Sequence, residues 1–393
     1  MNSDNNKKIR DGFLPYGRQW IDEDDIQMVV DVLRSDYLTT GPKIGELEKK
    51  LAEYLNVNFV VAISNGTAAL HAACFAAGIR EGDEVITTPI TFAASANCAL
   101  YLGAKPVFAD IDPETYNIDP EDIERKITDK TKAIIPVHFT GQPCDMDKIM
   151  AIARKYDLTV IEDGAHALGA EYKGRKIGGI GDMTTLSFHP VKHITTGEGG
   201  AIATNSRDLY EKLTIFRTHG ITRDSGKLTR DEGPWYYEQH VLGYNYRITD
   251  IQAALGISQM KKLDMFLQKR REYAGLYNGA FSSIEGIIAP YQADNVNSAW
   301  HLYVIRLELE KLKADRRKIF EELKSRNIGV NVHYIPVYYH PYYRGLGYEK
   351  GICPNAEKLY ERIITLPLFP GMSEDDLAYV VENVRDIINK HLM

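Results

Sequence analysis

The chain has 393 residues and a net charge of −7, and 44% of its residues are hydrophobic. This composition supplies a sizeable core and excludes an intrinsically disordered chain. The acidic balance argues against a nucleic-acid-binding protein, which normally presents a basic face. No run reaches the roughly 18 apolar residues that a membrane helix needs. We therefore expect neither nucleic acid nor a membrane among its partners.

The cysteines and the N-terminus both point to the cytoplasm. None of the four cysteines forms a CxxC pair, so neither a zinc knuckle nor a redox dithiol is indicated. Scattered cysteines in a chain of this length fit a reducing compartment. The N-terminal stretch MNSDNNKKIRDG is polar and lacks the apolar core of a signal peptide. The cysteines are Cys74, Cys98, Cys144 and Cys353.

Short apolar runs alternate with helical patterns between residues 58 and 205. Most runs are continuously apolar, which is typical of strands buried on both faces. Helical patterns such as TAALHAACFAAG (67–78) and DMDKIMAIARKYD (145–157) lie between several of them. This order predicts an α/β fold with a mainly parallel, seven-stranded sheet. The expected strands are NFVVAI (58–63), DEVITT (83–88), KPVFAD (105–110), KAIIPV (132–137), LTVIED (158–163), TTLSFH (184–189) and GAIATN (200–205).

The C-terminal part follows a different pattern. From residue 250 to about 281 it predicts one long helix that leads out of the large domain. A smaller α+β unit follows, with strands at 301–307 and 329–334, a helix at 316–327 and an amphipathic helix at 374–392. We therefore expect a large domain over 1–250, then a linker helix and a small domain over 251–393.

Two polar clusters fall at predicted strand ends, where open α/β sheets bind ligands. The first, SNGT (64–67), precedes a helix whose free N–H groups suit a phosphate, although such residues also cap most helices. The second, EDGAH (162–166), ends an apolar strand with two acids. These acids fit metal ligands, a catalytic pair or a partner for a cationic ring nitrogen; the alternative is a helix cap.

A third cluster, SFHPVKHITTGEGG (187–200), places Lys192 in a turn after a predicted strand, before three glycines that allow a tight backbone path. Desolvation lowers the pKa of a lysine and frees its amine to form a Schiff base. A lone lysine near glycines is usually a surface charge. A phosphate cradle, a strand-ending acid and a lysine together are the three anchors that pyridoxal phosphate needs.

Nearly the whole chain resembles the DegT/DnrJ/EryC1/StrS family of sugar aminotransferases, which have the fold type I architecture of aspartate aminotransferase. The resemblance starts near LTTGPKIGELEKKLAEYL (38–55). It implies pyridoxal 5′-phosphate as the cofactor, bound in the large domain. The motifs that carry it are SNGTAALHAA, DEVITTPITFAASANC, VIEDGAHALGA, SFHPVKHITTGEGG, GYNYRITDIQAALG and GVNVHYIPVY.

The resemblance implies a role for four residues around the cofactor ring. Lys192 matches the lysine that forms the Schiff base, and Asp163 matches the acid that pairs with the protonated pyridine nitrogen and keeps the ring an electron sink. His166 matches a Gln or His near O3′ of the ring. Phe92 matches the aromatic residue that stacks on the ring, and its alternative role is that of a core residue.

The resemblance also implies contacts to the cofactor phosphate. Gly66 and Thr67 match backbone and hydroxyl contacts, and Ser187 matches a further one. Asn245, in GYNYR, resembles an asparagine that reaches the phosphate from the neighbouring subunit. The alternative role of Asn245 is that of a turn residue without a ligand contact. If the match carries over, the protein is a homodimer with shared active sites.

The residue at position 192 separates two reactions of the family. Members that act as sugar dehydratases carry His where the aminotransferases carry Lys, so Lys192 favours an aminotransferase. The expected donor is L-glutamate, which leaves as 2-oxoglutarate. SFHPVK, ITTGEGG and SAWHLYVIRL look most like the branch that converts a UDP-linked 4-keto-6-deoxy-N-acetylhexosamine to its 4-amino sugar for pseudaminic acid. Branches of the perosamine and bacillosamine types stay open as alternatives.

Candidate contacts to the sugar nucleotide lie in the C-terminal half of the chain. Arginine matches diphosphate oxygens, and tyrosine offers a ring face and a hydroxyl. The chain has 24 tyrosines, however, and most must be structural. The candidates are Arg217, Arg223, His333, Tyr334 and the loop YYHPYYR (338–344).

Two rivals belong to other classes of protein. A regulatory homologue that keeps the fold without turnover would lack the lysine or the ring acid, and both are present. A metal-dependent hydrolase would need the set His138, His166, His189 and Glu162. Pro190 disfavours a helical metal pair between His189 and His193, and we expect no metal.

Overall fold

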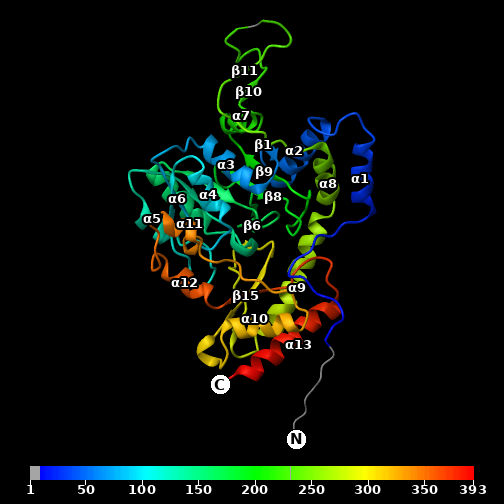
Figure 1. Cartoon of the computed structure of the whole chain (residues 1–393), viewed down its shortest axis with the longest axis vertical. Coiled ribbons are helices and arrows are strands. Elements are labelled where there is room, and N and C mark those ends of the chain that lie inside the picture. Colours follow the sequence, from blue (N-terminus) through cyan, green and yellow to red (C-terminus); the bar gives the residue numbers. More distant parts are fainter. Residues whose placement is uncertain (1–8, 231) are drawn as a thin grey trace.

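The computed structural model describes residues 9–230 and 232–393 (Figure 1). Its centre is the expected seven-stranded sheet, with strand order β1-β9-β8-β5-β4-β2-β3. The parallel pairing is confirmed, although β9 runs antiparallel to both of its neighbours. The strands are β1 (Phe59–Ile63), β2 (Glu84–Thr87), β3 (Lys105–Phe108), β4 (Thr131–Ile135), β5 (Thr159–Asp163), β8 (Met183–Ser187) and β9 (Gly200–Thr204).

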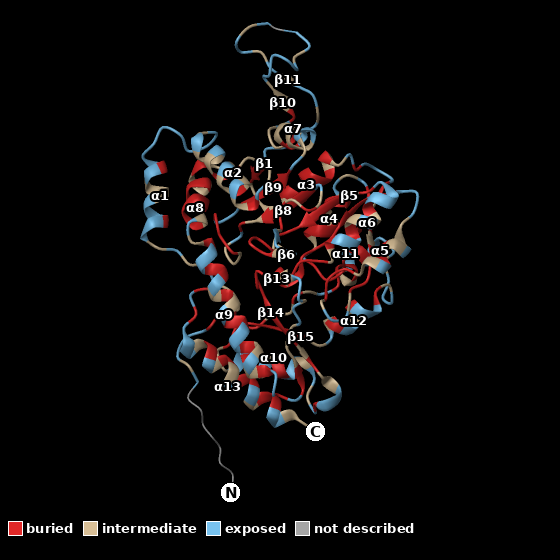
Figure 2. Cartoon of the chain, turned by 180° about the vertical axis from the view of Figure 1, so that it is seen from behind, coloured by how far each residue is buried: buried red, intermediate tan, exposed pale blue. Residues whose placement is uncertain are grey.

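The sheet is buried on both faces because successive side chains of a strand point to opposite sides. In β1, Val60 and Ala62 join one apolar cluster while Val61 and Ile63 join another. Figure 2 shows the sheet as buried and α1 (Glu23–Leu33) as largely exposed. The first cluster draws on α2 (Pro42–Leu55), α5 (Pro120–Lys126), α6 (Met146–Tyr156) and α8 (Asp250–Met260). The second draws on α3 (Gly66–Ala76), α4 (Ala94–Leu100) and α7 (Arg207–Phe216).

A second sheet organises the C-terminal part. Its three antiparallel strands are β12 (Ile287–Ile288), β14 (Tyr303–Leu307) and β15 (Ile363–Leu366). They share an apolar core with α9 (Leu263–Phe281), α10 (Arg316–Ser325) and α13 (Glu374–His391). Leu14 joins this core from the N-terminal segment. The helices expected at 316–327 and 374–392 are confirmed, and the domain division at residue 250 stays a prediction.

The single helix expected over 250–281 is wrong. It is two helices, α8 and α9, with Lys261 and Lys262 between them. Nζ of Lys262 lies 2.6 Å from Oδ1 of Asp22 and 2.7 Å from Oδ2 of Asp25. These partners lie more than 200 positions away in sequence, so the local pattern carries no sign of the break.

The strand expected at 329–334 is also wrong. The segment forms only an isolated bridge between Asn331 and Thr365. The N–H of Gly329 donates to the carbonyl of Leu14 instead. Residues 331–335 all line a cavity, so this segment is an irregular cavity wall and not a strand.

A narrow arm projects from the large sheet at the top of Figure 1. It carries the two-stranded ladder of β10 (Ile221–Thr222) and β11 (Glu238–Gln239). Within the described residues, no helix has both the length and the apolar character to cross a membrane. The signal-peptide prediction concerns mainly residues 1–8, outside the described ranges. The other short strands and α-helices are β6 (Glu171–Tyr172), β7 (Arg175–Lys176), β13 (Val296–Asn297), α11 (Pro341–Gly345) and α12 (Pro354–Tyr360).

Candidate active site

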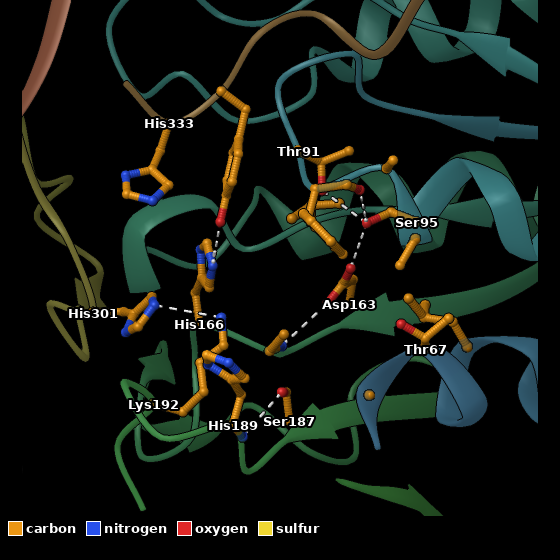
Figure 3. Close-up of a pocket in the computed structure, with 18 of the residues that line it drawn as sticks. Thr67, Thr91, Ser95, Asp163, His166, Ser187, His189, Lys192, His301 and His333 are labelled. Carbon is orange, nitrogen blue, oxygen red and sulfur yellow. Dashed lines mark hydrogen bonds between the residues drawn. The ribbon is translucent and has the colours of Figure 1, made fainter. Parts of the chain in front are cut away.

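A cavity of about 1240 Å³ lies at the carboxyl ends of the parallel strands. Asp163 ends β5, Ser187 ends β8, and both line it. His301 and residues 331–335 close it from the C-terminal part. Figure 3 shows Lys192 and His301 on one side of the view and Asp163, Ser95 and Thr67 on the other. The cavity thus collects side chains from both parts of the chain.

Asp163 is held at the end of β5 by two hydrogen bonds. Its Oδ2 accepts from the hydroxyl of Ser95 at 2.7 Å, and its Oδ1 accepts from the N–H of Ala165 at 3.1 Å. The hydroxyl of Thr91 lies 2.7 Å from that of Ser95 and extends the chain of hydrogen bonds. The side chain is nearly buried, so this network fixes the direction in which the carboxylate faces the cavity.

Glu162, the neighbouring acid, serves the core instead. Its Oε1 accepts from the N–H of Gly181 and the hydroxyl of Thr184, each at 2.8 Å. Its Oε2 lies 3.0 Å from Nε2 of His138, whose Nδ1 accepts from the N–H of Cys144 at 3.1 Å. Since Nδ1 is an acceptor, Nε2 carries the proton and donates it to Glu162. Neither His138 nor Glu162 lines the cavity.

The N-terminus of α3 supplies backbone donors to the cavity. Asn65 caps the helix by accepting from the N–H of Ala68 at 2.8 Å. The N–H groups of Gly66 and Thr67 have no intrahelical carbonyl, so they are free for an anion. A Cβ on Gly66 would lie 3.0 Å from Cβ of Ser187, so glycine lets the two cavity walls approach.

Gly200 explains one of the three glycines after Lys192. A Cβ there would lie 2.7 Å from the carbonyl oxygen of Leu186 and 2.8 Å from the backbone of Asn65. The start of β9 therefore packs directly against the turn that begins α3. This close approach fixes the position of the lysine-bearing loop relative to the anion-binding turn.

Lys192 presents its amine to the cavity. Burial is the main cause that lowers its pKa to about 8; the negative Asp163 opposes this shift and the positive Arg270 adds to it. Nζ lies 3.4 Å from Nε2 of His301, a contact that the sequence did not predict. At pH 7 about a tenth of this lysine is therefore a free amine, far more than for an ordinary lysine, and a Schiff-base lysine reacts in this form.

Four histidines surround this amine. His166 and Tyr334 meet across the cavity, with Nε2 and the hydroxyl 3.2 Å apart. Burial lowers the pKa of His166, His193 and His301 well below the ordinary value, and lowers that of His333 to about 3. All four imidazoles are therefore neutral near pH 7.

The position of Phe92 fits its predicted role of stacking on the cofactor ring, which stays a prediction. Its ring is 62% exposed and lines the cavity, which is unusual for a large apolar side chain in a protein core. It is thus not a core residue. An exposed ring that shares the cavity with the Asp163 carboxylate is suited to pack on a flat heterocycle.

Several predicted contacts lie elsewhere in this chain. Arg217 binds Oε1 of Glu48 at 2.5 Å and the carbonyl of Ala62 at 2.6 Å, and Arg223 stacks on Tyr237 in the arm. Asn245 is exposed beside the arm. None of the three lines the cavity.

The predicted loop 338–344 contributes little to the cavity. The hydroxyl of Tyr338 donates to Glu357 at 2.7 Å, and that of Tyr343 donates to Asn97 at 2.6 Å. Both rings are buried, and of this loop only His340 lines the cavity. The loop therefore supports the cavity wall more than it offers contacts.

Sequence reasoning missed Thr91, Ser95, Tyr16 and His301. Thr91 and Ser95 lie on either side of Phe92, within the quoted motif DEVITTPITFAASANC, but Thr91 precedes α4, so no helical spacing links the two hydroxyls. The chain's own motif SAWHLY contains His301, but nothing local indicates that it meets Lys192, 109 positions away. Tyr16 comes from the N-terminal segment, with its ring centroid 5.2 Å from that of His333.

These groups fit pyridoxal phosphate. The free N–H groups at α3 suit its phosphate, and the Asp163 carboxylate suits a cationic ring nitrogen. Lys192 suits its aldehyde, and Phe92 suits its ring face. Nδ1 of His166 is buried without a partner, which leaves a polar atom for a ligand. Among the described residues, no group of three His, Cys, Asp or Glu side chains is arranged to hold a metal.

The sequence model of the DegT/DnrJ/EryC1/StrS aminotransferase family matches residues 19–385, so the chain belongs to this family. An uncharacterized protein of Methanocaldococcus jannaschii is 51% identical over 98% of this chain and 100% of its own length. The spore coat polysaccharide biosynthesis protein SpsC of Bacillus subtilis is 45% identical over 96% and 98% of the two chains. A pleiotropic regulatory protein of Geobacillus stearothermophilus is 40% identical over 92% and 94%.

Solved structures confirm the expected fold type I. The PLP form of a Streptococcus pneumoniae protein described as a sugar aminotransferase, Spr1654, matches with a TM-score of 0.90 and 34% identity over 96% of this chain and 99% of that one. PseC of Helicobacter pylori, an aminotransferase involved in pseudaminic acid biosynthesis, matches with a TM-score of 0.89 and 33% identity over 96% and 100%.

Proposed function

We propose that this protein is a pyridoxal-phosphate-dependent aminotransferase that converts a UDP-linked 4-keto-6-deoxy-N-acetylhexosamine to the 4-amino sugar, with L-glutamate as the donor. The observation that carries the chemistry is that Lys192, Asp163 and the N-terminus of α3 line one cavity. A regulatory homologue without turnover has no need of this combination, although one relative carries a regulatory name.

The residues divide the work as follows. The bound cofactor supplies an electron-withdrawing ring. Asp163, held by Ser95 and Ala165, would orient that ring through its nitrogen. The N–H groups at α3 would bind the phosphate. The amine of Lys192 would take a proton from the donor carbon that loses nitrogen and would deliver a proton to the sugar carbon that gains it, with the amino group carried on the cofactor between the two half-reactions.

The buried surroundings make Lys192 an effective base. Its pKa of about 8 lies near a physiological working pH, where a general base is most useful. The neutral imidazoles around it add no positive charge to the cavity. They also occupy space next to the amine and thereby limit access of water.

The proposed sugar rests on two relatives. PseC acts in pseudaminic acid biosynthesis, and its structure resembles this chain over nearly the full length of both. SpsC is more similar in sequence and is named for spore coat polysaccharide. Its higher identity favours, as a second candidate, the aminotransferase of another nucleotide-linked 4-keto sugar.

The sugar contacts that we propose are His333 and Tyr334, because both line the cavity. Nδ1 of His333 lies 2.8 Å from the hydroxyl of Thr365, so its ring is fixed in the cavity wall. Arg217 and Arg223 stay predictions, since both are engaged outside the cavity of their own chain.

We also propose that two copies of the chain share their active sites. The arm exposes Trp235 (69%) and Leu242 (77%), which are large apolar side chains suited to a partner surface. Asn245 lies at the base of this arm, outside the cavity of its own chain. From there a second copy would bring it to the cofactor phosphate.

Mixing two inactive variants tests this shared site. Lys192→Ala and Asn245→Asp subunits are denatured, mixed and refolded together. If Asn245 serves the other subunit, each mixed dimer has one intact site, and roughly a quarter of wild-type activity returns. Activity that stays at the level of the separately refolded variants would contradict the shared site.

Product mass spectrometry tests the substrate. The enzyme, with L-glutamate, is given the UDP-linked 4-keto-6-deoxy-N-acetyl sugars of L-arabino and D-xylo configuration side by side. A 4-amino product from the L-arabino sugar alone supports the pseudaminic acid assignment. A product mainly from the D-xylo sugar moves the enzyme to a bacillosamine-type pathway.

We retain the cytoplasm as its location, which the four free, buried cysteines support.

A further inference from the structure

The backbone of His301 is held by hydrogen bonds on both sides of its imidazole. Its backbone N–H donates to the carbonyl of Thr140 at 2.7 Å, and its backbone carbonyl accepts from Nη1 of Arg270 at 3.1 Å. The side chain is almost fully buried. The backbone on both sides of the imidazole is therefore tied down, with the ring beside Nζ of Lys192 at 3.4 Å (Figure 3).

The two ring nitrogens of His301 have unequal surroundings. Nε2 faces the Lys192 amine, whereas Nδ1 is buried without a partner. A buried N–H without an acceptor is more costly and rarer than a buried lone pair without a donor. The neutral ring therefore places its proton on Nε2 and leaves the lone pair on Nδ1.

His193 shows the same arrangement nearby. Its Nε2 lies 3.0 Å from the carbonyl of Ala299, and a carbonyl can only accept. Its proton is therefore on Nε2, and its buried Nδ1 also lacks a partner. This part of the protein thus tolerates an unpaired Nδ1 lone pair in a second ring.

An imidazole with its proton on Nε2 distinguishes the two forms of lysine. A neutral amine has a lone pair and accepts the hydrogen bond, but an ammonium group has only donors. We propose that His301 is a positioning residue for Lys192, whose Nε2–H donates to the free amine and holds it in the base form. The inference rests on the proposed role of Lys192 as the reacting amine.

Other groups around the pair act in known directions. Burial lowers the pKa of Lys192, Arg270 of α9 lowers it further, and Asp163 of β5 raises it. The pKa of His301 is lowered by burial first, then by Lys192 and the neighbouring rings. The titratable and charged groups that face the pair are Asp163, His166, His193, Arg270 and His333.

The tautomer can be read directly in the wild-type protein. Full-length, cofactor-free protein with ¹⁵N-labelled histidine is studied by long-range ¹H–¹⁵N NMR at pH 9, and the His301 signals are assigned by their loss in His301→Gln. A proton on Nε2 supports the proposal, and a proton on Nδ1 overturns it. This measurement requires no turnover, so it is independent of the proposed function.

Uptake of pyridoxal phosphate tests the consequence. The rate at which the cofactor-free protein gains the visible absorbance of bound cofactor is measured against pH. The wild-type rate is expected to rise with a midpoint near pH 8. In His301→Leu the midpoint moves up by about one unit, which makes uptake near pH 7 roughly tenfold slower.

His301→Gln is the matched control, because its amide N–H₂ can donate from nearly the same place as Nε2. We expect its midpoint within about 0.3 units of wild type. A midpoint in His301→Leu that is unchanged or lower would overturn the proposal. A midpoint in His301→Gln as high as in His301→Leu would also overturn the proposal. Glutamine keeps the hydrogen-bond donor but cannot take up and release a proton, so this result would mean that the imidazole acts by proton transfer. If wild-type protein takes up no cofactor while the Nε2 proton is observed, the proposed function fails and the pairing of the two residues stands.

Discussion

Glu162 and Asp163 are consecutive residues of β5, and their carboxylates serve opposite sides of the sheet. Glu162 is fully buried against His138 and Thr184, whereas Asp163 lines the cavity and accepts from Ser95. The alternation of side chains along a strand produces this separation. Within the described residues, the two acids therefore form neither a catalytic pair nor a shared metal site.

The opposite roles of these acids predict opposite defects. Asp163→Asn keeps the size of the side chain but removes its charge. The amide oxygen can still accept from the N–H of Ala165, and the amide N–H₂ can donate to the Ser95 hydroxyl, which can rotate. We therefore expect kcat to fall by about 10²-fold or more with little change in stability. Glu162→Gln places an amide N–H₂ in a site with four donors, so we expect about 2–4 kcal/mol lower stability. Urea unfolding and steady-state kinetics on both variants measure this. A stable Glu162→Gln protein with no activity would contradict the division of roles.

The lowered pKa of Lys192 predicts that its charged form destabilises the folded protein. Its pKa is lowered from 10.5 to about 8, mainly by burial, so the unfolded chain binds more protons than the folded chain between these values. The penalty for the charged amine is fully present below pH 8 and is relieved as pH rises to 10.5. Lys192→Met should therefore stabilise the cofactor-free protein near pH 7 by about 2 kcal/mol, with hydration from the cavity allowed for, and less at higher pH.

Thermal unfolding of wild type and Lys192→Met between pH 7 and 10.5 checks this prediction. The variant must also lose turnover. A stability difference that does not change with pH would show that the effect comes from the added apolar group and not from the charge. Normal turnover in the variant would refute the assignment of Lys192.

Ser95 predicts a smaller effect that acts through Asp163. Ser95→Ala removes the 2.7 Å bond to Oδ2, so the carboxylate loses one of two fixed donors. A hydrogen bond to a charged group contributes about 1.5–3 kcal/mol, and we expect cofactor to be held about 10- to 100-fold more weakly. Ser95→Thr keeps the hydroxyl and is the control. Equal cofactor affinity in all three proteins, measured by equilibrium dialysis, would remove Ser95 from the site.

Gly66 predicts a defect in binding the phosphate. An added Cβ would lie 3.0 Å from Cβ of Ser187, so Gly66→Ala pushes the two walls of the anion site apart. We expect at least about tenfold weaker retention of pyridoxal phosphate, the equivalent of about 1.4 kcal/mol. Gly45→Ala is the control, because a Cβ at this α2 position meets nothing within 4 Å and alanine favours a helix by about 0.5–1 kcal/mol. Unchanged retention in Gly66→Ala would place the phosphate elsewhere.

The sequence predicted the large sheet well because its strands are apolar on both faces, and this signal is local. It also predicted the cavity residues at the strand ends, Asp163 and Lys192. It failed where distant segments decide the structure. At the break after α8, Lys262 pairs with Asp22 and Asp25, and the 329–334 segment bonds to Leu14 and lines the cavity.

His301 shows the same limit within the site. Its partner is 109 positions away, and the loop that places it is held by Thr140 and Arg270, which no local pattern connects. The arginines predicted as sugar-nucleotide contacts show the opposite error, because their residue type fits the site but their position does not. Arg217 carries the right chemistry for a diphosphate, but the fold directs it to Glu48.

The central claim is that Lys192 holds the cofactor, and chemical trapping tests it most directly. Protein purified with pyridoxal phosphate is reduced with sodium borohydride, digested and mapped by mass spectrometry. The account predicts a phosphopyridoxyl group on the peptide that contains Lys192, and its loss from that peptide in Lys192→Ala. A label on a different lysine, or no label on a protein that shows the bound cofactor's absorbance, would contradict it.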